Sequence, residues 1–194
     1  MKTILVTGGA GFIGSHTCLL LLENKIKVYV IDSFENSSPK ALSRVINLYS
    51  NGNKSLNSNL KVYKGNLCDK IFLEEFFQDI NKRKEKIDGI IHFAGVKAVS
   101  ESVKEPLLYW ETNLMGTINL LEMMKKYECR NLVFSGSATI YDQNKNCSLK
   151  ENSNLAPLNP YGNTKLSVEI LLNDVFKSSL QDWKFASLRY FNPI

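Results

Sequence analysis

The chain has 194 residues, of which 44% are hydrophobic and 22% charged, and this composition excludes a wholly disordered chain and leads us to expect one domain. The net charge of +5 comes from scattered Lys and Arg residues, so we expect no binding to nucleic acid. No cleavable leader precedes the first strand and no apolar run approaches the length of a membrane span, so a soluble cytoplasmic protein is expected.

The N-terminus reads as a strand, a glycine loop and a helix. A β-rich run ends at Thr7, Gly8-Gly9-Ala10-Gly11-Phe12-Ile13-Gly14 follows at once, and a helix-forming run covers 17–22. Gly8 would allow a tight turn, Gly11 would let the backbone approach a pyrophosphate, and Gly14 would let the helix pack close to the strand. The alternative is that these glycines only form a turn.

The second strand ends at Asp32, eighteen residues after Gly14. An acidic side chain at this point accepts hydrogen bonds from the ribose of an adenine dinucleotide. Because a 2′-phosphate would meet this carboxylate with no obvious arginine beside it, the sequence favours NAD over NADP as the cofactor.

Strand-like runs alternate with helical patterns along the whole chain. Such alternation predicts an α/β fold of the Rossmann type, a doubly wound parallel sheet with helices on both faces. The expected strands are 4–7, 28–32, 60–63, 87–93, 131–135 and 185–190. The clearest expected helices are 72–80, 106–126 and 160–176, and the Asn-rich stretches 51–59 and 142–147 are expected to be mobile surface loops.

Four cysteines, Cys18, Cys68, Cys129 and Cys147, lie far apart and lack metal-ligand spacing. They are expected to be reduced thiols, and no metal is predicted.

Tyr161 and Lys165 are spaced by one helical turn. Asn159 can cap this helix and Pro160 suits its first position, so Tyr161 would lie at the positive end of the helix dipole with Lys165 on the same face. Both neighbours would favour a phenolate, which would let Tyr161 transfer protons near neutral pH. The alternative for an isolated pair is a packing Tyr and a solvated Lys.

With these motifs in register, the chain resembles the extended short-chain dehydrogenases/reductases, and within them the epimerases that interconvert UDP-glucose and UDP-galactose. The stretches that carry the resemblance are 6–17, 91–103, 134–141, 159–165 and 189–193. The resemblance implies that Ser137 binds the sugar 4-hydroxyl, that Tyr161 is the acid/base, and that Lys165 holds the nicotinamide ribose and depresses the tyrosine pKa.

The resemblance also implies the remaining binding residues. The cofactor NAD would contact Gly8, Gly11, Phe12, Ile13, Gly14, Asp32, Asn66, Leu67, Phe93, Ala94, Gly95, Lys97, Tyr161, Lys165 and Phe191. The substrate would contact Lys97, Ser137, Tyr161 and Asn192. A homodimer is left open.

The chain departs from the family pattern at three places. Asn66 stands where the family usually has an Asp beside the adenine, and we expect its amide to accept the same hydrogen bond more weakly. Asp142 replaces a usual Gly. The family continues beyond Pro193, so residues 1–194 are expected to be the NAD-binding domain alone, with impaired activity. The alternatives are a non-catalytic NAD-binding module and another NAD-dependent nucleotide-sugar epimerase or dehydratase.

Overall fold

The centre of the protein is a six-stranded sheet in the order β3-β2-β1-β4-β5-β6, with every neighbouring pair parallel. The structure is a computed structural model, and it describes residues 1–142, 148–178 and 182–191. The strands are β1 (Thr3–Thr7), β2 (Lys27–Asp32), β3 (Leu60–Lys64), β4 (Gly89–His92), β5 (Asn131–Ser137) and β6 (Lys184–Tyr190). This is the doubly wound parallel sheet that the alternation of strands and helices predicted.

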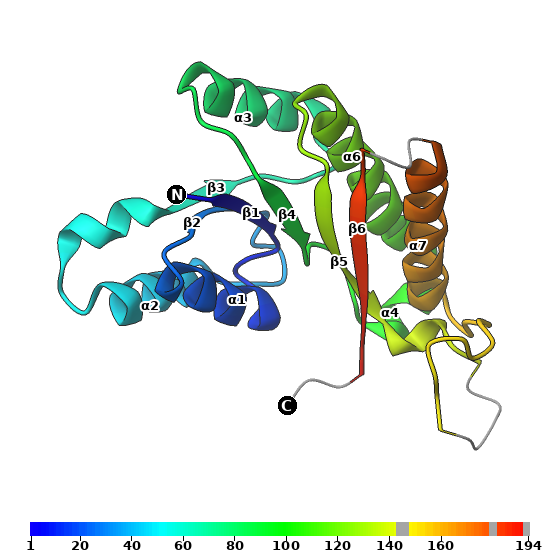
Figure 1. The fold of residues 1–194 in the computed structure, drawn as a ribbon. Helices are drawn as coiled ribbons and strands as arrows, with labels where there is room; N and C mark the ends of the chain where they lie inside the picture. The colour runs from blue at the N-terminus through cyan, green and yellow to red at the C-terminus, as the bar shows by residue number, and fades with distance from the viewer. Residues whose placement is uncertain (143–147, 179–181, 192–194) are drawn as a thin grey trace.

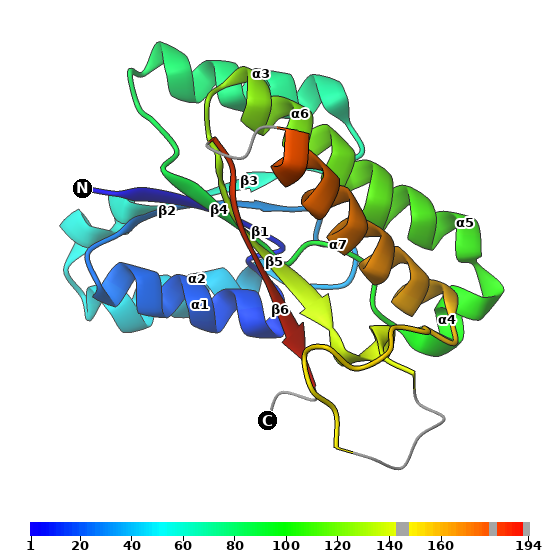
Figure 2. The same ribbon diagram turned by 45° about the vertical axis from the view of Figure 1, so that its right-hand side comes forward.

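Helices cover both faces of the sheet (Figures 1 and 2). One face carries α1 (Phe12–Glu23) and α2 (Pro39–Ser50). The opposite face carries α3 (Lys70–Lys82), α6 (Gly116–Lys126) and α7 (Pro160–Ser178). The chain crosses from one face to the other between β3 and β4, so the strand order reverses beside β1.

Strand β2 shows why the sheet needs both layers. Val28 and Val30 belong to the core under α1 and α2, while Tyr29 and Ile31 belong to the core on the other face. All four side chains are at most 1% exposed. A strand buried on both faces reads as a continuous apolar run, which is how it was found in the sequence.

The helix expected over 106–126 is not regular. It consists of α5 (Pro106–Tyr109), a π-helical segment η2 (Trp110–Met115) and α6. Apolar periodicity continues through such a segment, so the sequence pattern did not reveal it. π-Helical turns inside α-helices are frequent at functional sites.

Two further helices were not among those predicted, α2 and the short α4 (Val99–Lys104). A local signal for α2 was present, because the Ser38 side chain accepts a hydrogen bond from the Lys40 backbone N–H, and Pro39 occupies the first helical position.

The Asn-rich stretch 51–59 is not wholly irregular, because it contains a 3₁₀-helix, η1 (Lys54–Asn59). Residues 143–147, most of the second expected loop, lie outside the described residues. Over the described ranges, none of the helices is long and apolar enough to cross a membrane.

Strand β6 lies at the edge of the sheet and is paired with β5 along its length. Arg189 fastens it to the rest of the molecule. Its guanidinium pairs with the Glu169 carboxylate of α7 at 2.8 Å and donates to Tyr141 Oη at 2.7 Å and to the Glu151 carbonyl at 2.8 Å. The side chains of Arg189 and Glu169 are only 23% and 10% exposed, so this pair is shielded from solvent.

Replacing Arg189 with Met should therefore destabilise the fold by about 2 kcal/mol, because it leaves the Glu169 carboxylate without its charged partner in a largely buried place. The free energy of unfolding in urea measures the effect. As the matched control, Lys70→Met removes the exposed pair with Glu122 and should cost less than about 1 kcal/mol. Equal losses in the two variants would contradict this account of how β6 is held.

Candidate functional site

A cavity of about 320 Å³ opens at the carboxyl edge of the sheet, where the strand order reverses. Open parallel sheets bind their ligands at this point, because the loops after neighbouring strands diverge there and leave a crevice. Of the residues predicted to bind the cofactor, those lining the cavity are Gly8, Gly11, Phe12, Ile13, Gly14, Asp32, Asn66, Leu67, Phe93, Ala94, Gly95, Lys97, Tyr161 and Lys165.

Two of the predicted site residues within the described ranges do not line this cavity. Phe191, immediately after β6, is 63% exposed. Ser137 ends β5 and is buried, and its hydroxyl acts to lower the pKa of Tyr161. Asn192 lies outside the described residues.

The glycine turn between β1 and α1 has the close packing expected of it. Gly8 has φ +70°, and a Cβ there would lie 2.6 Å from the Ala94 backbone nitrogen. A Cβ on Gly14 would lie 2.4 Å from the Gly8 carbonyl oxygen. Both positions therefore exclude any side chain, which confirms the roles predicted for them in the turn and in helix packing.

The N-terminus of α1 faces the cavity. Gly11 is the N-cap and gives no side-chain cap, and Gly11, Phe12, Ile13 and Gly14 all line the cavity. The first N–H groups of a helix lack partners within it, and the helix dipole adds a partial positive charge. This end of the cavity is therefore suited to an anion such as a phosphate group.

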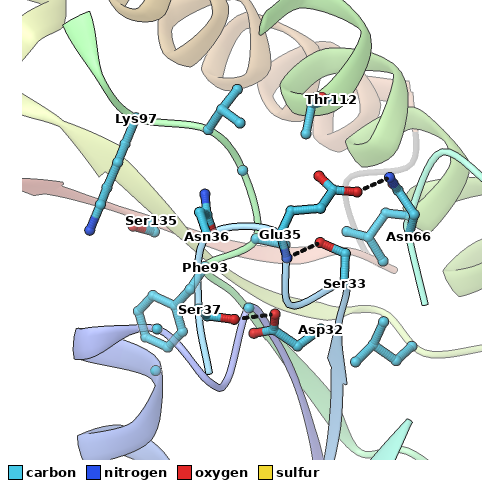
Figure 3. A pocket seen from close by; sticks show the side chains of 18 of the residues that line it. Asp32, Ser33, Glu35, Asn36, Ser37, Asn66, Phe93, Lys97, Thr112 and Ser135 are labelled. Atoms are coloured by element: carbon cyan, nitrogen blue, oxygen red, sulfur yellow. Dashed lines mark hydrogen bonds between the residues drawn. The ribbon is translucent and has the colours of Figure 1, made fainter. Parts of the chain in front are cut away.

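Asp32 ties the glycine turn to the end of β2. It is 7% exposed, and its Oδ2 accepts a hydrogen bond from Ala10 N at 2.9 Å. Its Oδ1 accepts from Phe34 N at 2.9 Å and from Ser37 Oγ at 2.8 Å (Figure 3). An ionised carboxylate offers about four lone-pair sites, so Asp32 can still accept from a ligand hydroxyl.

Glu35 and Asn66 face each other at the same end of the cavity (Figure 3). Asn66 Oδ1 accepts a hydrogen bond from Cys68 N at 3.0 Å, which leaves Nδ2 toward Glu35 Oε1 at 3.5 Å. The Asn66 oxygen is thus shared with the backbone, and the expectation that it accepts a weak hydrogen bond from a ligand stays a prediction. Glu35 was not predicted as a site residue.

The loop after β4 is held by Asn113, which lies in the π-helical segment η2 and is 4% exposed. Its Oδ1 accepts from Val96 N at 2.9 Å, and its Nδ2 donates to Val96 O and to Thr164 Oγ1, both at 3.0 Å. The side chain thus links this cavity wall to α7. Sequence reasoning missed Asn113, although a polar residue inside an apolar helical stretch was a usable signal.

Helix α7 begins as predicted. The Asn159 side chain accepts a hydrogen bond from Gly162 N at 2.9 Å, and Pro160 is the first helical residue. Tyr161 is half-buried and Lys165 is 5% exposed. Lys165 Nζ donates to the Ser135 carbonyl at 2.9 Å and lies 5.9 Å from the centre of the Tyr161 ring.

Burial dominates the titration of this pair. It raises the pKa of Tyr161 above its ordinary value, and the hydrogen bond with Ser137 only partly opposes it. Burial also lowers the pKa of Lys165 to about 8. The predicted depression of the tyrosine pKa is therefore not found in the chain alone, where burial raises it.

His92 lies behind this pair and is a structural residue. Its ring is 2% exposed, Nδ1 is 2.6 Å from Thr7 Oγ1, and Nε2 is 2.9 Å from Thr117 Oγ1. Burial, with the charge of Lys165, lowers the pKa of His92 to about 3. The imidazole is therefore neutral at physiological pH.

No group of three potential metal ligands comes together within the ranges that the structure describes. Cys18 and Cys129 are buried and Cys68 is half-buried, all as free thiols, and Cys147 lies outside the described residues. Burial raises the pKa of Cys18 to about 12 and that of Cys129 to about 11, so neither is a reactive thiolate.

Comparison with curated proteins gives close relatives over the whole chain. UDP-glucose 4-epimerase 2 of Arabidopsis thaliana is 47% identical over 194 residues, which is 100% of this chain and 52% of the relative. The bifunctional UDP-glucose 4-epimerase and UDP-xylose 4-epimerase 1 of Pisum sativum is 46% identical over 193 residues, 100% of this chain and 53% of that protein. The chain thus spans about half the length of the curated relatives it matches.

Solved structures agree with this result. UDP-glucose 4-epimerase from Bifidobacterium longum, in complex with NAD⁺ and UDP, superposes with a TM-score of 0.88 at 40% identity, covering 100% of this chain and 54% of that one. The UDP-Glc/GlcNAc 4-epimerase of Campylobacter jejuni gives a TM-score of 0.86 at 33% identity, with 99% and 54% covered. The family model described as GDP-mannose 4,6-dehydratase matches residues 5–193, and the chain therefore belongs to that family.

Proposed function

We propose that the chain binds NAD in the cavity at the carboxyl edge of the sheet, and that the protein interconverts UDP-glucose and UDP-galactose by epimerisation at C4 of the sugar. One observation carries the proposal: the glycine turn, Asp32, Tyr161 and Lys165 line a single cavity. The relatives named as UDP-glucose 4-epimerases support the same activity. Because the chain spans about half of those relatives, the proposed activity is that of the whole protein.

The residues present fit a dinucleotide. At Gly8 and Gly14 a Cβ would collide with backbone, so the turn stays narrow and a pyrophosphate could approach the N-terminus of α1 closely. Asp32 would accept from the adenosine ribose, and Lys165 would hold the nicotinamide ribose. When bound, NAD supplies a hydride acceptor that later returns the hydride to the opposite face of the sugar carbon.

Tyr161 would exchange the proton of the sugar 4-hydroxyl. With its pKa raised by burial, the phenol is protonated in the chain alone, so it becomes a base only when positive charge is brought beside it. Lys165 already lies beside Tyr161, so the further charge would come from an oxidised, cationic nicotinamide. Ser137 would hydrogen-bond the same hydroxyl.

The remaining predicted contacts are made with the substrate and with the cofactor. Lys97 is exposed at the cavity rim, where its charge would offset that of a nucleotide-sugar phosphate. Asn192 would hydrogen-bond the substrate, and Phe191 would contact the cofactor from the end of β6.

The turn after Ser137 favours epimerisation over dehydration. Elimination of water from a sugar needs a further acid/base carboxylate beside the Ser position, and this chain has Ala138 and Thr139 there. The Thr139 hydroxyl donates to Ser137 Oγ at 2.9 Å, so it orients Ser137 and is not a free acid. The remaining alternative is a module that binds NAD without catalysis. A measurement of turnover distinguishes such a module from an epimerase.

The unsubstituted chain should bind NAD more tightly than NADP, because a 2′-phosphate would meet the carboxylate of Asp32. Asp32→Asn removes that charge while keeping one acceptor. It should reduce the ratio of NAD affinity to NADP affinity by about tenfold. Isothermal titration with both dinucleotides measures this, and Asp174→Asn on the exposed side of α7 is the control. Equal affinity of the unsubstituted chain for NAD and NADP would overturn the assignment of Asp32.

Tyr161→Phe should lower the rate of interconversion of UDP-galactose and UDP-glucose by a factor of about 10² to 10⁴, because it removes the proton-transfer group and keeps the ring. The change is made in a chimera in which this chain replaces the matching 194 residues of the Arabidopsis relative. NAD binding should be retained. Tyr49→Phe, in α2 and away from the cavity, should keep full turnover. Undiminished turnover in the Tyr161 variant would refute the proposed mechanism.

Lys165 should also give the fold a pH dependence. Its pKa of about 8 lies below the ordinary value of 10.5, so the unfolded chain binds the extra proton between these values and stability rises with pH across that window. Relative to Lys165→Met, the unsubstituted chain should gain about 1 to 3 kcal/mol between pH 8 and 10.5. Urea unfolding of both chains across this range isolates the contribution of Lys165 to the free energy of unfolding, because the contributions of the other titratable groups cancel in the difference. A difference independent of pH would show that the ammonium is not desolvated.

A further inference from the structure

We propose that Glu35 recognises the adenine base of the dinucleotide, with its carboxylate accepting a hydrogen bond from the exocyclic 6-amino group and the Asn66 amide holding that carboxylate in place. The inference rests on the proposed binding of NAD and goes beyond it, because it assigns a ligand contact to a residue outside the predicted set.

The place of the base follows from the rest of the cavity. If the pyrophosphate lies on the glycine turn and the ribose on Asp32, the base must lie beyond Asp32, on the side away from Tyr161 and Lys165. The lining residues at that end include Ser33, Glu35, Asn66 and Leu67. Figure 3 shows Glu35 extending across this end of the cavity toward Asn66.

The hydrogen-bonding capacity of this end assigns the roles. The 6-amino group of adenine is a donor and needs an acceptor. Asn66 Oδ1 already accepts from Cys68 N at 3.0 Å and belongs to a neutral amide, whereas Glu35 carries a carboxylate, which is the stronger acceptor. Ser33 Oγ already accepts from Glu35 N at 3.4 Å. The Glu35 carboxylate has one oxygen 3.5 Å from Asn66 Nδ2 and the other available to the base.

This arrangement also predicts selectivity. Hypoxanthine carries a carbonyl oxygen where adenine carries the amino group, so that oxygen would face the carboxylate and be repelled. Leu67 offers an apolar surface that either base can contact equally. Discrimination between the two bases should therefore depend on the Glu35 carboxylate.

The test compares NAD with nicotinamide hypoxanthine dinucleotide, whose base carries a 6-oxo group in place of the 6-amino group and a proton on N1. By isothermal titration, the unsubstituted chain should bind NAD about tenfold more tightly. Glu35→Ala should abolish most of this preference, chiefly by weakening NAD. Glu35 is exposed, so the variant should fold normally. Glu23→Ala, at the end of α1 and outside the cavity, should keep the full preference.

A second variant should restore the preference for NAD that Glu35→Ala removes. Adding Asn66→Asp to Glu35→Ala places a carboxylate whose second oxygen replaces the amide nitrogen at this end of the cavity, and the preference for NAD should return. If the unsubstituted chain does not bind NAD at all, the proposed dinucleotide site is wrong. If it binds NAD but shows no preference, or if the preference survives Glu35→Ala, the site stands and the role of Glu35 is refuted.

Discussion

The site depends on the close approach of backbone to backbone at the glycine turn. A side chain at Gly14 would strike the Gly8 carbonyl, and one at Gly8 would strike the loop that follows β4. Because both are absent, α1 starts directly against the end of β1, and the loops after β1 and β4 touch. The same contact therefore sets the direction of the helix N-terminus and the position of the wall that carries Phe93 to Lys97.

The opposite wall is built around a buried cation. Lys165 is held between the Ser135 carbonyl, at 2.9 Å, and the face of the Phe134 ring, with its nitrogen 4.8 Å from the ring centre. No carboxylate neutralises it in the part of the chain that the structure describes. A charge kept in this way costs stability, and such local costs are typical of functional sites. Its neighbours Tyr161 and His92 are uncharged in the same surroundings, so the lysine charge is not cancelled by them.

Local sequence patterns predicted the backbone elements that form this site. Its electrostatics and its side-chain pairings depend on tertiary contacts. The glycine turn, Asp32 and the start of α7 follow from short-range sequence rules, so they could be predicted. The pKa of Tyr161 depends on how much solvent the fold removes, which spacing along a helix does not reveal. Asn113 and Glu35 act on residues 17 and 31 positions away, and such pairings are not encoded in any local pattern.

The π-helical segment η2 has a consequence for how this protein can vary. An α-helix turns by about 100° per residue, so inserting or deleting one residue between Trp110 and Met115 would rotate the preceding α5 relative to α6 by about that angle. Asn113 would then turn away from Val96 and Thr164, which it now joins. Length changes should thus be excluded from this segment, while substitutions on its exposed side, such as at Glu111, remain compatible with the same path of the chain.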